Sequence, residues 1–193
     1  MSYFDNAVKS GNYSKGPSFT DVSKCFFELK GKRYGVVGLG NIGSKVAHIA
    51  KAFGMEVVYY STSGNPHSDE FQAVSLEELM STCDVISVHC PLNERTNNLI
   101  TYDKLALMKK TAYIINLGRG GIINEADLVK ALNDNLLAGA GVDVFAKEPL
   151  PLDSPYFNVA DPLKILLTPH IGWASQEART CLMAKIAENI ANN

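Results

Sequence analysis

Arg119, Glu148 and His170 are residue types that could together bind an organic acid and move a proton. A guanidinium group binds a carboxylate through two parallel hydrogen bonds and can also polarise a carbonyl group. A carboxylate beside an imidazole fixes the tautomer of the ring and favours its protonated form, which suits a proton donor. An isolated histidine is more often structural, so the case for His170 depends on whether the fold brings these residues together.

All three residues follow apolar runs that are candidates for β-strands. The runs are continuous rather than alternating, as expected of parallel strands that are covered on both faces. Helical patterns separate them, which predicts a doubly wound parallel α/β sheet of the Rossmann type in three α/β/α layers. Ligands bind beyond the carboxyl ends of the strands in such sheets. The predicted strands are residues 34–38, 57–60, 85–88, 112–117, 138–145 and 165–167.

Four helices are expected between and after these strands. The first carries an apolar stripe at i, i+3, i+4 and i+7, which would face the sheet, and it ends at Gly54. The second opens with the capping-box pattern at residues 75–78, the third runs from Asn124 to about Leu132, and the last begins near Ser175. The stripe of the first helix is Val46, Ile49, Ala50 and Phe53, and that of the last is Leu182, Ile186 and Ile190.

The first predicted strand is followed by a glycine pattern of the form GxGxxG at residues 38–43. Its position between a strand and a helix gives this otherwise weak pattern a physical meaning. Gly38 permits a tight turn, Gly40 lets the backbone approach a pyrophosphate, and Gly43 allows close packing of helix on strand. The amides of Asn41 and Ile42 would then meet the phosphate at the helix N-terminus. The pattern predicts dinucleotide binding.

The residues after the second predicted strand bear on the choice of cofactor. An Asp or Glu at this point accepts hydrogen bonds from the ribose hydroxyls and favours NAD, whereas an Arg can bind the 2′-phosphate of NADP. This chain has Ser61 and Thr62, whose hydroxyls can hydrogen-bond to either group. Both residues are candidate cofactor contacts, with NAD expected and NADP possible.

The ordered set of motifs resembles the D-specific 2-hydroxyacid dehydrogenases, the family of D-lactate, glycerate and phosphoglycerate dehydrogenases. The resemblance runs from about residue 31 to the last predicted helix. It implies an NAD(P)-dependent oxidoreductase that transfers a hydride between NAD(P)H and a 2-oxo acid or D-2-hydroxy acid. The motifs are GLGNIG at 38–43, HCPL at 89–92 with Thr96, NLGRGG at 116–121, DVFAKEP at 143–149 and TPHIGW at 168–173.

The same resemblance implies a role for each candidate residue. His170 would be the acid or base at the substrate oxygen, Glu148 would hold His170, and Arg119 would bind the substrate carboxylate. Other motif residues fall where the family contacts the cofactor, with Asp143 beside the nicotinamide. These further contacts are Cys90, Pro91, Thr96, Leu117, Gly118 and Gly172, with Arg119 and His170 also bordering the cofactor.

The resemblance also implies a domain organisation. Residues 31–175 correspond to the cofactor domain, and residues 176–193 correspond to the truncated start of a helix that returns to the substrate domain in the family. Only about 30 residues precede the first strand, so the substrate domain is expected to be absent and the chain to be a fragment. We therefore expect cofactor binding with little turnover of the small-molecule substrate.

Residues 1–30 are expected to form an arm or linker, because turn-forming residues are concentrated at 10–18. In the family the cofactor domains pair as homodimers, and this segment falls where relatives make contacts between subunits. Its aromatic side chains could be buried against a second subunit or against their own domain, and both alternatives stay open. The aromatic residues are Tyr3, Phe4, Tyr13, Phe19, Phe26 and Phe27.

Two other functions compete with the dehydrogenase hypothesis. One is a non-enzymatic, NAD(H)-responsive interaction or regulatory module, since relatives of that type can retain Arg119, Glu148 and His170. The other is a short-chain reductase, which uses a Tyr-x-x-x-Lys pair. No matching tyrosine lies in a helix after the fourth predicted strand, which makes this second alternative the weaker one.

The composition argues against several classes of protein. The 193 residues carry a net charge of −2 without a basic run, which argues against a nucleic-acid partner. No stretch approaches the roughly 18 apolar residues of a membrane span, and the N-terminal residues lack the pattern of a signal peptide. The four cysteines and four histidines are scattered, so no metal site is expected. The expected location is cytoplasmic.

Overall fold

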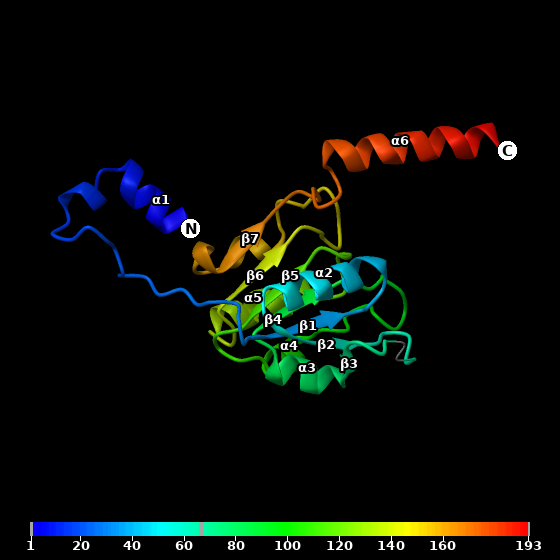
Figure 1. Ribbon diagram of the computed structural model, residues 1–193, viewed down its shortest axis with the longest axis horizontal. Helices are drawn as coiled ribbons and strands as arrows, with labels where there is room; N and C mark the ends of the chain where they lie inside the picture. The colour runs from blue at the N-terminus through cyan, green and yellow to red at the C-terminus, as the bar shows by residue number, and fades with distance from the viewer. Residues whose placement is uncertain (1, 66–67, 193) are drawn as a thin grey trace.

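The computed structural model describes residues 2–65 and 68–192, and its centre is a seven-stranded parallel sheet (Figure 1). The strand order is β3-β2-β1-β4-β5-β6-β7, which confirms the doubly wound α/β prediction. Six strands overlap the predicted runs, although β6 ends at Val142 where the run extended to Phe145, and the two-residue β3 is too short to leave a sequence pattern. The strands are β1 (Arg33–Val37), β2 (Glu56–Tyr60), β3 (Gln72–Ala73), β4 (Val85–Val88), β5 (Tyr113–Asn116), β6 (Gly139–Val142) and β7 (Ile165–Leu167).

The register of the central strands aligns their carboxyl ends at one edge of the sheet. Val37 pairs with Val88 of β4, Val88 pairs with Asn116 of β5, and Asn116 pairs with Val142 of β6. Each of these residues is the last of its strand. The segments that follow β1, β4, β5 and β6 therefore emerge side by side, as the placement of the motifs requires.

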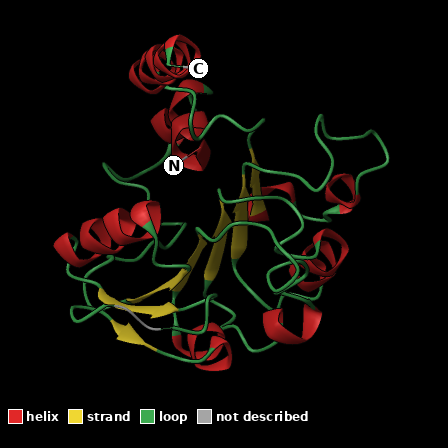
Figure 2. Ribbon diagram, turned by 90° about the vertical axis from the view of Figure 1, so that its right-hand side faces the viewer, coloured by secondary structure: helices red, strands yellow, loops and turns green. Residues whose placement is uncertain are grey.

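Different helices cover the two faces of the sheet. Alternation along β1 sends Val36 to one face and Val37 to the other, and the two residues belong to separate buried clusters. Val37 shares its cluster with side chains of α3 (Leu76–Thr82), α4 (Tyr102–Leu105) and α5 (Glu125–Asn133). Val36 shares its cluster with α2 (Asn41–Ala52) and β2. Helices flank both sides of the sheet in Figure 2.

The face of α2 that meets the sheet differs from the predicted apolar stripe. Gly43, Ala47 and Ala50 are buried, whereas Ile49 and Phe53 are 58% and 61% exposed. Small side chains let the helix approach β1 and β2 closely, so they form the contact in place of the larger apolar residues. The larger residues instead border a cavity of about 820 Å³, the sheet-face groove, which runs between α2 and β7. Its apolar lining includes Ile49, Phe53, Tyr113, Ile115, Leu163 and Leu166.

Both ends of the described chain lie off the sheet in Figure 1. The predicted arm contains α1 (Ser2–Lys9) and a short 3₁₀ helix, η1 (Tyr13–Lys15), which the turn-forming residues around them did not indicate. At the other end α6 (Gln176–Ala191) begins after its N-cap Ser175, close to the predicted start, and it has no buried residue. No helix among the described residues is long and apolar enough to span a membrane.

The remaining helix starts follow the expected capping chemistry. The Ser75 hydroxyl accepts a hydrogen bond from the amide of Glu78, and the Asn124 side chain accepts one from the amide of Asp127. Two further 3₁₀ helices, η2 (Pro155–Asn158) and η3 (Pro162–Lys164), lie between β6 and β7. The helix starts that the sequence predicted from capping residues are therefore confirmed.

Candidate active site

The glycine turn between β1 and α2 leaves an open stretch of backbone. Gly38 has a positive φ of 93°, and a Cβ there would lie 2.8 Å from Cβ of Cys90. A Cβ on Gly43 would lie 2.2 Å from the carbonyl oxygen of Gly38, so this position also requires glycine. At Gly40, in contrast, a Cβ would meet no atom within 4 Å. The open side of Gly40, beside the first amides of α2, fits a pyrophosphate.

A cleft of about 510 Å³ extends from the start of α2 to the ends of β4 and β5. It brings together three segments that the sequence assigned to cofactor binding, and it adds His89 and Leu92. Cys90 is 3% exposed, and burial raises the pKa of its thiol to about 11, so it forms an uncharged wall. The lining residues are Ile42, His89, Cys90, Pro91, Leu92, Leu117, Gly118 and Arg119.

His89 was not assigned to the site, although it directly follows β4. Its Nε2 lies 2.8 Å from the hydroxyl of Ser87, which is on the same face of the strand. Burial lowers the pKa of the His89 imidazole. A neutral ring therefore contributes to the cleft wall, and its position at a strand end was the signal that could have identified it.

Arg119 is displayed by a turn that a buried asparagine fixes. The side chain of Asn116 donates to the carbonyl oxygen of Arg119 at 2.9 Å and accepts from the amide of Gly118 at 3.1 Å. The Arg119 side chain is exposed, and its Nη1 donates to the carbonyl oxygen of Gly118 at 2.8 Å. The turn thus places a guanidinium group at the mouth of the cleft.

Glu148 and His170 are in direct contact, as the sequence predicted. Nδ1 of His170 lies 2.7 Å from Oε2 of Glu148, and Oε1 of Glu148 accepts a hydrogen bond from the amide of Phe145 at 2.9 Å. The Phe145 amide, His170 and the nearby Arg119 hold the pKa of Glu148 below its usual range. An ionised Glu148 orients the imidazole through Nδ1 and leaves Nε2 for a proton transfer.

Asp143 anchors the loop that carries His170. Its buried carboxylate accepts hydrogen bonds from the Thr168 hydroxyl and from the amides of Ile171 and Gly172, the last two at 2.9 and 2.8 Å. Burial alone would raise the pKa of Asp143, but these three donors and the neighbouring His170 outweigh burial and lower it. His170 itself has a positive φ of 53°, which this loop must maintain. The predicted contacts of Asp143 and Gly172 with a cofactor stay predictions.

Three other predicted contacts occupy different settings. Thr96 is buried, and its hydroxyl donates to the carbonyl oxygen of Pro91 at 2.6 Å, so it supports the cleft wall from behind. Ser61 and Thr62 are half-buried after β2, and the Ser61 hydroxyl donates to the carbonyl oxygen of Asn65 at 3.0 Å. Residues 61–65 carry no charged side chain.

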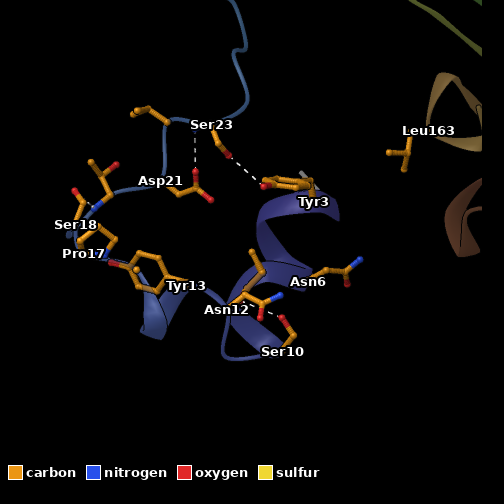
Figure 3. A pocket seen from close by; sticks show the side chains of 14 residues that line it. Tyr3, Asn6, Ser10, Asn12, Tyr13, Pro17, Ser18, Asp21, Ser23 and Leu163 are labelled. Atoms are coloured by element: carbon orange, nitrogen blue, oxygen red, sulfur yellow. Dashed lines mark hydrogen bonds between the residues drawn. The ribbon is translucent and has the colours of Figure 1, made fainter.

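A cavity of about 860 Å³ lies within the arm, far in sequence from the candidate residues (Figure 3). Its lining comes from α1, η1 and the segment that follows them, with Leu163 as the one contribution from the sheet domain. Neither this arm cavity nor the sheet-face groove is lined by Arg119, Glu148 or His170. Of the three residues, Arg119 lines the cleft at the strand ends.

Comparison with known families gives one result over most of the chain. The family model described as D-isomer specific 2-hydroxyacid dehydrogenase, NAD binding domain, matches residues 1–172. A glyoxylate reductase of Aeropyrum pernix is 41% identical over 166 residues, which are 84% of this chain and 49% of that protein. The chain spans about half the length of the curated relatives that it matches.

Two solved structures are similar to the whole described fold. One is a D-lactate dehydrogenase from Aquifex aeolicus complexed with NAD and lactic acid, at a TM-score of 0.85 and 29% identity. The match covers 98% of this chain and 60% of that one. The other is an acyclic imino acid reductase in complex with NADPH and D-Arg, at a TM-score of 0.84 and 34% identity, covering 98% and 58%.

Proposed function

The chain belongs to the family of D-isomer specific 2-hydroxyacid dehydrogenases, and on that premise we propose that it serves hydride transfer between NAD(P)H and a 2-oxo acid. The reverse reaction oxidises a D-2-hydroxy acid. One observation carries the proposal: the 2.7 Å contact of His170 with Glu148 lies on the sheet edge that also holds the glycine turn and Arg119. An acid–base pair, a carboxylate-binding group and a phosphate-binding turn on one edge are what this reaction needs.

The cofactor would lie along the carboxyl ends of the central strands. The turn around Gly40 and the amides of Asn41 and Ile42 would bind its pyrophosphate, and Pro91 and Leu117 would flank its nicotinamide half. A bound nicotinamide dinucleotide supplies or accepts the hydride, and the protein supplies position and electrostatics.

The substrate chemistry falls to the three charged residues. Arg119 binds the substrate carboxylate and polarises the neighbouring carbonyl group. His170 gives the proton on Nε2 to the carbonyl oxygen during reduction and takes it back from the hydroxyl during oxidation. Glu148 holds Nδ1 of His170 at 2.7 Å and balances the positive charge of the ring before the proton leaves.

We further propose that the cofactor site accepts both NAD and NADP. An acidic residue after β2 would repel a 2′-phosphate, and Ser61 carries no such charge. The hydroxyls of Ser61 and Thr62 can hydrogen-bond to a ribose hydroxyl or to a phosphate oxygen.

The 193-residue polypeptide is proposed to bind the cofactor but to reduce 2-oxo acids slowly. Arg119 is exposed and the His170 side chain is 37% exposed, so these groups of the proposed site are open to water. A site that stays open to water loses much of its electrostatic stabilisation. The test is calorimetric titration with NADH and NADPH, followed by a 340 nm assay with glyoxylate and hydroxypyruvate. Rapid reduction would contradict the expected slow turnover, and absence of binding would contradict the proposed function.

A homodimer through the arm is the proposed assembly. Phe19, Phe26 and Phe27 are 91%, 82% and 72% exposed, which supports burial against a second copy over packing on their own domain. An arm that exposes three aromatic rings is expected to bury them against a second copy. Sedimentation showing only a monomer at micromolar concentration would contradict this proposal.

An NAD(H)-responsive interaction or regulatory module is kept as the second candidate, because the exposed apolar side chains of the arm and of α6 suit a binding partner. The two candidates differ in one measurable respect. A regulatory module would change its self-association when it binds NADH, and His170→Gln would leave its function unchanged. A dehydrogenase would instead lose hydride transfer in His170→Gln. The predicted cytoplasmic location stays a prediction.

A further inference from the structure

The peptide unit between Phe145 and Ala146 lies where the parts of the candidate site meet. On one side it packs against the Arg119 turn so closely that a Cβ on Gly120 would lie 1.9 Å from the carbonyl carbon of Phe145. The amide of Phe145 donates to Oε1 of Glu148, whose other oxygen contacts His170. The amide that binds Glu148 belongs to the preceding peptide unit, so it is the residue Phe145 that links the Arg119 turn to the contact between Glu148 and His170.

The N–H of the Phe145–Ala146 peptide unit is held by a residue outside every predicted motif. The amide of Ala146 donates to Oε1 of Glu125 at 2.7 Å, although the two residues are 21 positions apart. Glu125 is half-buried and is the first residue of α5, after the N-cap Asn124. A carboxylate is stabilised at the N-terminus of a helix, and hydrogen bonds to an ionised acceptor are stronger than neutral ones.

We propose that Glu125 is a positioning residue, which fixes the Phe145–Ala146 peptide and through it the contact between Glu148 and His170. It touches none of the groups that would react. The description of Glu148 and His170 as the reacting pair rests on the proposed function, whereas the chain of contacts from Glu125 to His170 rests on the geometry alone.

Truncation of Glu125 is expected to displace the loop of Glu148 without unfolding the protein. Ala146 is exposed, so water can replace the lost acceptor when Glu125 is truncated, and the global fold is expected to survive. The loop would nevertheless lose its fixed course. The low pKa of Glu148 depends first on the Phe145 amide and then on His170 and Arg119, which are the groups that face it. Displacement of the loop is therefore expected to raise that pKa.

The test is a carbon-detected NMR titration of the Glu148 carboxyl group in the full 193-residue chain, with the ring nitrogens of His170 observed in the same samples. Glu125→Ala is expected to shift the Glu148 midpoint upward, toward the ordinary value of about 4.3, and to mix the His170 tautomers. Glu125→Gln keeps an acceptor oxygen and is expected to match the unaltered chain. Glu125→Asp, one methylene shorter, is expected to behave like the alanine variant.

Asp127 provides the matched control within the first turn of the same helix. Its Oδ2 accepts a hydrogen bond from the amide of Tyr102 at 2.9 Å, so Asp127→Ala also removes a carboxylate that holds a loop, but not the loop of Glu148. This control is expected to leave the Glu148 midpoint unchanged.

Three results would overturn the role of Glu125. The first is an unchanged Glu148 midpoint in a folded Glu125→Ala variant, and the second is an equal shift of that midpoint in Asp127→Ala. The third applies if Glu125→Ala does not fold, and it is an unchanged Glu148 midpoint in both Glu125→Asp and Glu125→Gln. NADH binding by the unaltered chain is measured separately, and its absence would contradict the proposed function while leaving the contact chain intact.

Discussion

Replacing Asp143 by asparagine changes one atom of the carboxylate that anchors the His170 loop. Oδ1 accepts hydrogen bonds from the Thr168 hydroxyl and the Ile171 amide, and Oδ2 accepts one from the Gly172 amide at 2.8 Å. The asparagine amide can keep its oxygen on one side only. Its NH₂ group then faces an N–H or O–H donor that can no longer donate to it.

The size of the effect follows from these contacts. The side chain is nearly isosteric, so no cavity forms, and the loss is confined to one hydrogen bond and the charge that assists the others. Hydrogen bonds to charged groups contribute about 1.5–3 kcal/mol, and a buried donor without a partner costs about 1–3 kcal/mol. Ile171 and Gly172 are exposed residues, which favours the lower end of these ranges. We expect Asp143→Asn to lower the free energy of unfolding by about 2 kcal/mol.

Two measurements are needed to assign this loss to the loop. Urea unfolding followed by circular dichroism gives the free energy, and the fluorescence of Trp173, the single tryptophan, reports on the loop three residues from His170. Asp161→Asn is the matched control, because the exposed Asp161 side chain accepts one amide hydrogen bond, from Leu163 at 3.0 Å. The control is expected to lose less than about 1 kcal/mol.

The anchoring role of Asp143 would be refuted by a specific combination of results. In Asp143→Asn, the free energy of unfolding would fall by less than about 0.5 kcal/mol, which is the ordinary range for a neutral surface substitution, and the Trp173 fluorescence spectrum would be unchanged.

Three further predictions concern pH, cofactor choice and the glycine turn. Because the folded-state pKa of Asp143 is lowered, its stabilising contribution is fully present above the unfolded value of about 3.9 and is lost as the pH falls through the lower folded value. The Trp173 signal of the unaltered chain should therefore hold at pH 5 and change in more acidic solution, whereas an acid-insensitive signal down to unfolding would contradict this. Ser61→Asp should weaken NADPH binding about tenfold and leave NADH binding nearly unchanged. The reason is that a carboxylate about 5 Å from a 2′-phosphate is repelled by roughly 1–2 kcal/mol in a water-like medium. Equal effects on both cofactors in calorimetric titrations would refute this prediction. Gly43→Ala places a Cβ 2.2 Å from the Gly38 carbonyl oxygen and should weaken NADH binding by at least tenfold, whereas Gly141→Ala, whose Cβ would meet its nearest atom at 3.7 Å, should bind normally.

The strand ends could be predicted from the sequence because each motif follows a continuous apolar run. Parallel strands in a doubly wound sheet present their carboxyl ends at one edge, so topology places Glu148 and His170 on the same edge, and the family resemblance implies that Glu148 holds His170. The 2.7 Å contact confirms that step.

The face of α2 could not be predicted from periodicity alone. Hydrophobic spacing assigns the largest apolar residues to the core, yet here Gly43 and Ala47 make the close contact while Ile49 and Phe53 border the sheet-face groove. The helix α2 has a stripe of small residues and a stripe of larger apolar residues. How closely the helix approaches the strands decides which of the two stripes faces the sheet.

The residues that support the site were also beyond the reach of the sequence. Glu125 is 21 positions from Ala146, and Asp143, which the motifs assigned to the cofactor, is 28 positions from Ile171. Both contacts depend on the course of loops, which motif spacing does not specify. Glutamate at the start of a helix is common for reasons of the helix dipole alone, so its second contact leaves no separate signal.

The most direct test of the account is a map of NADH-induced shifts in the amide NMR spectrum of the 193-residue chain. We predict saturable shifts along the strand-end edge, at Gly40, Gly118 and the loop of His170, with the arm cavity and the sheet-face groove unaffected. Shifts confined to Phe53 and the groove, to Tyr13 and the arm cavity, or no saturable shift at all would contradict it.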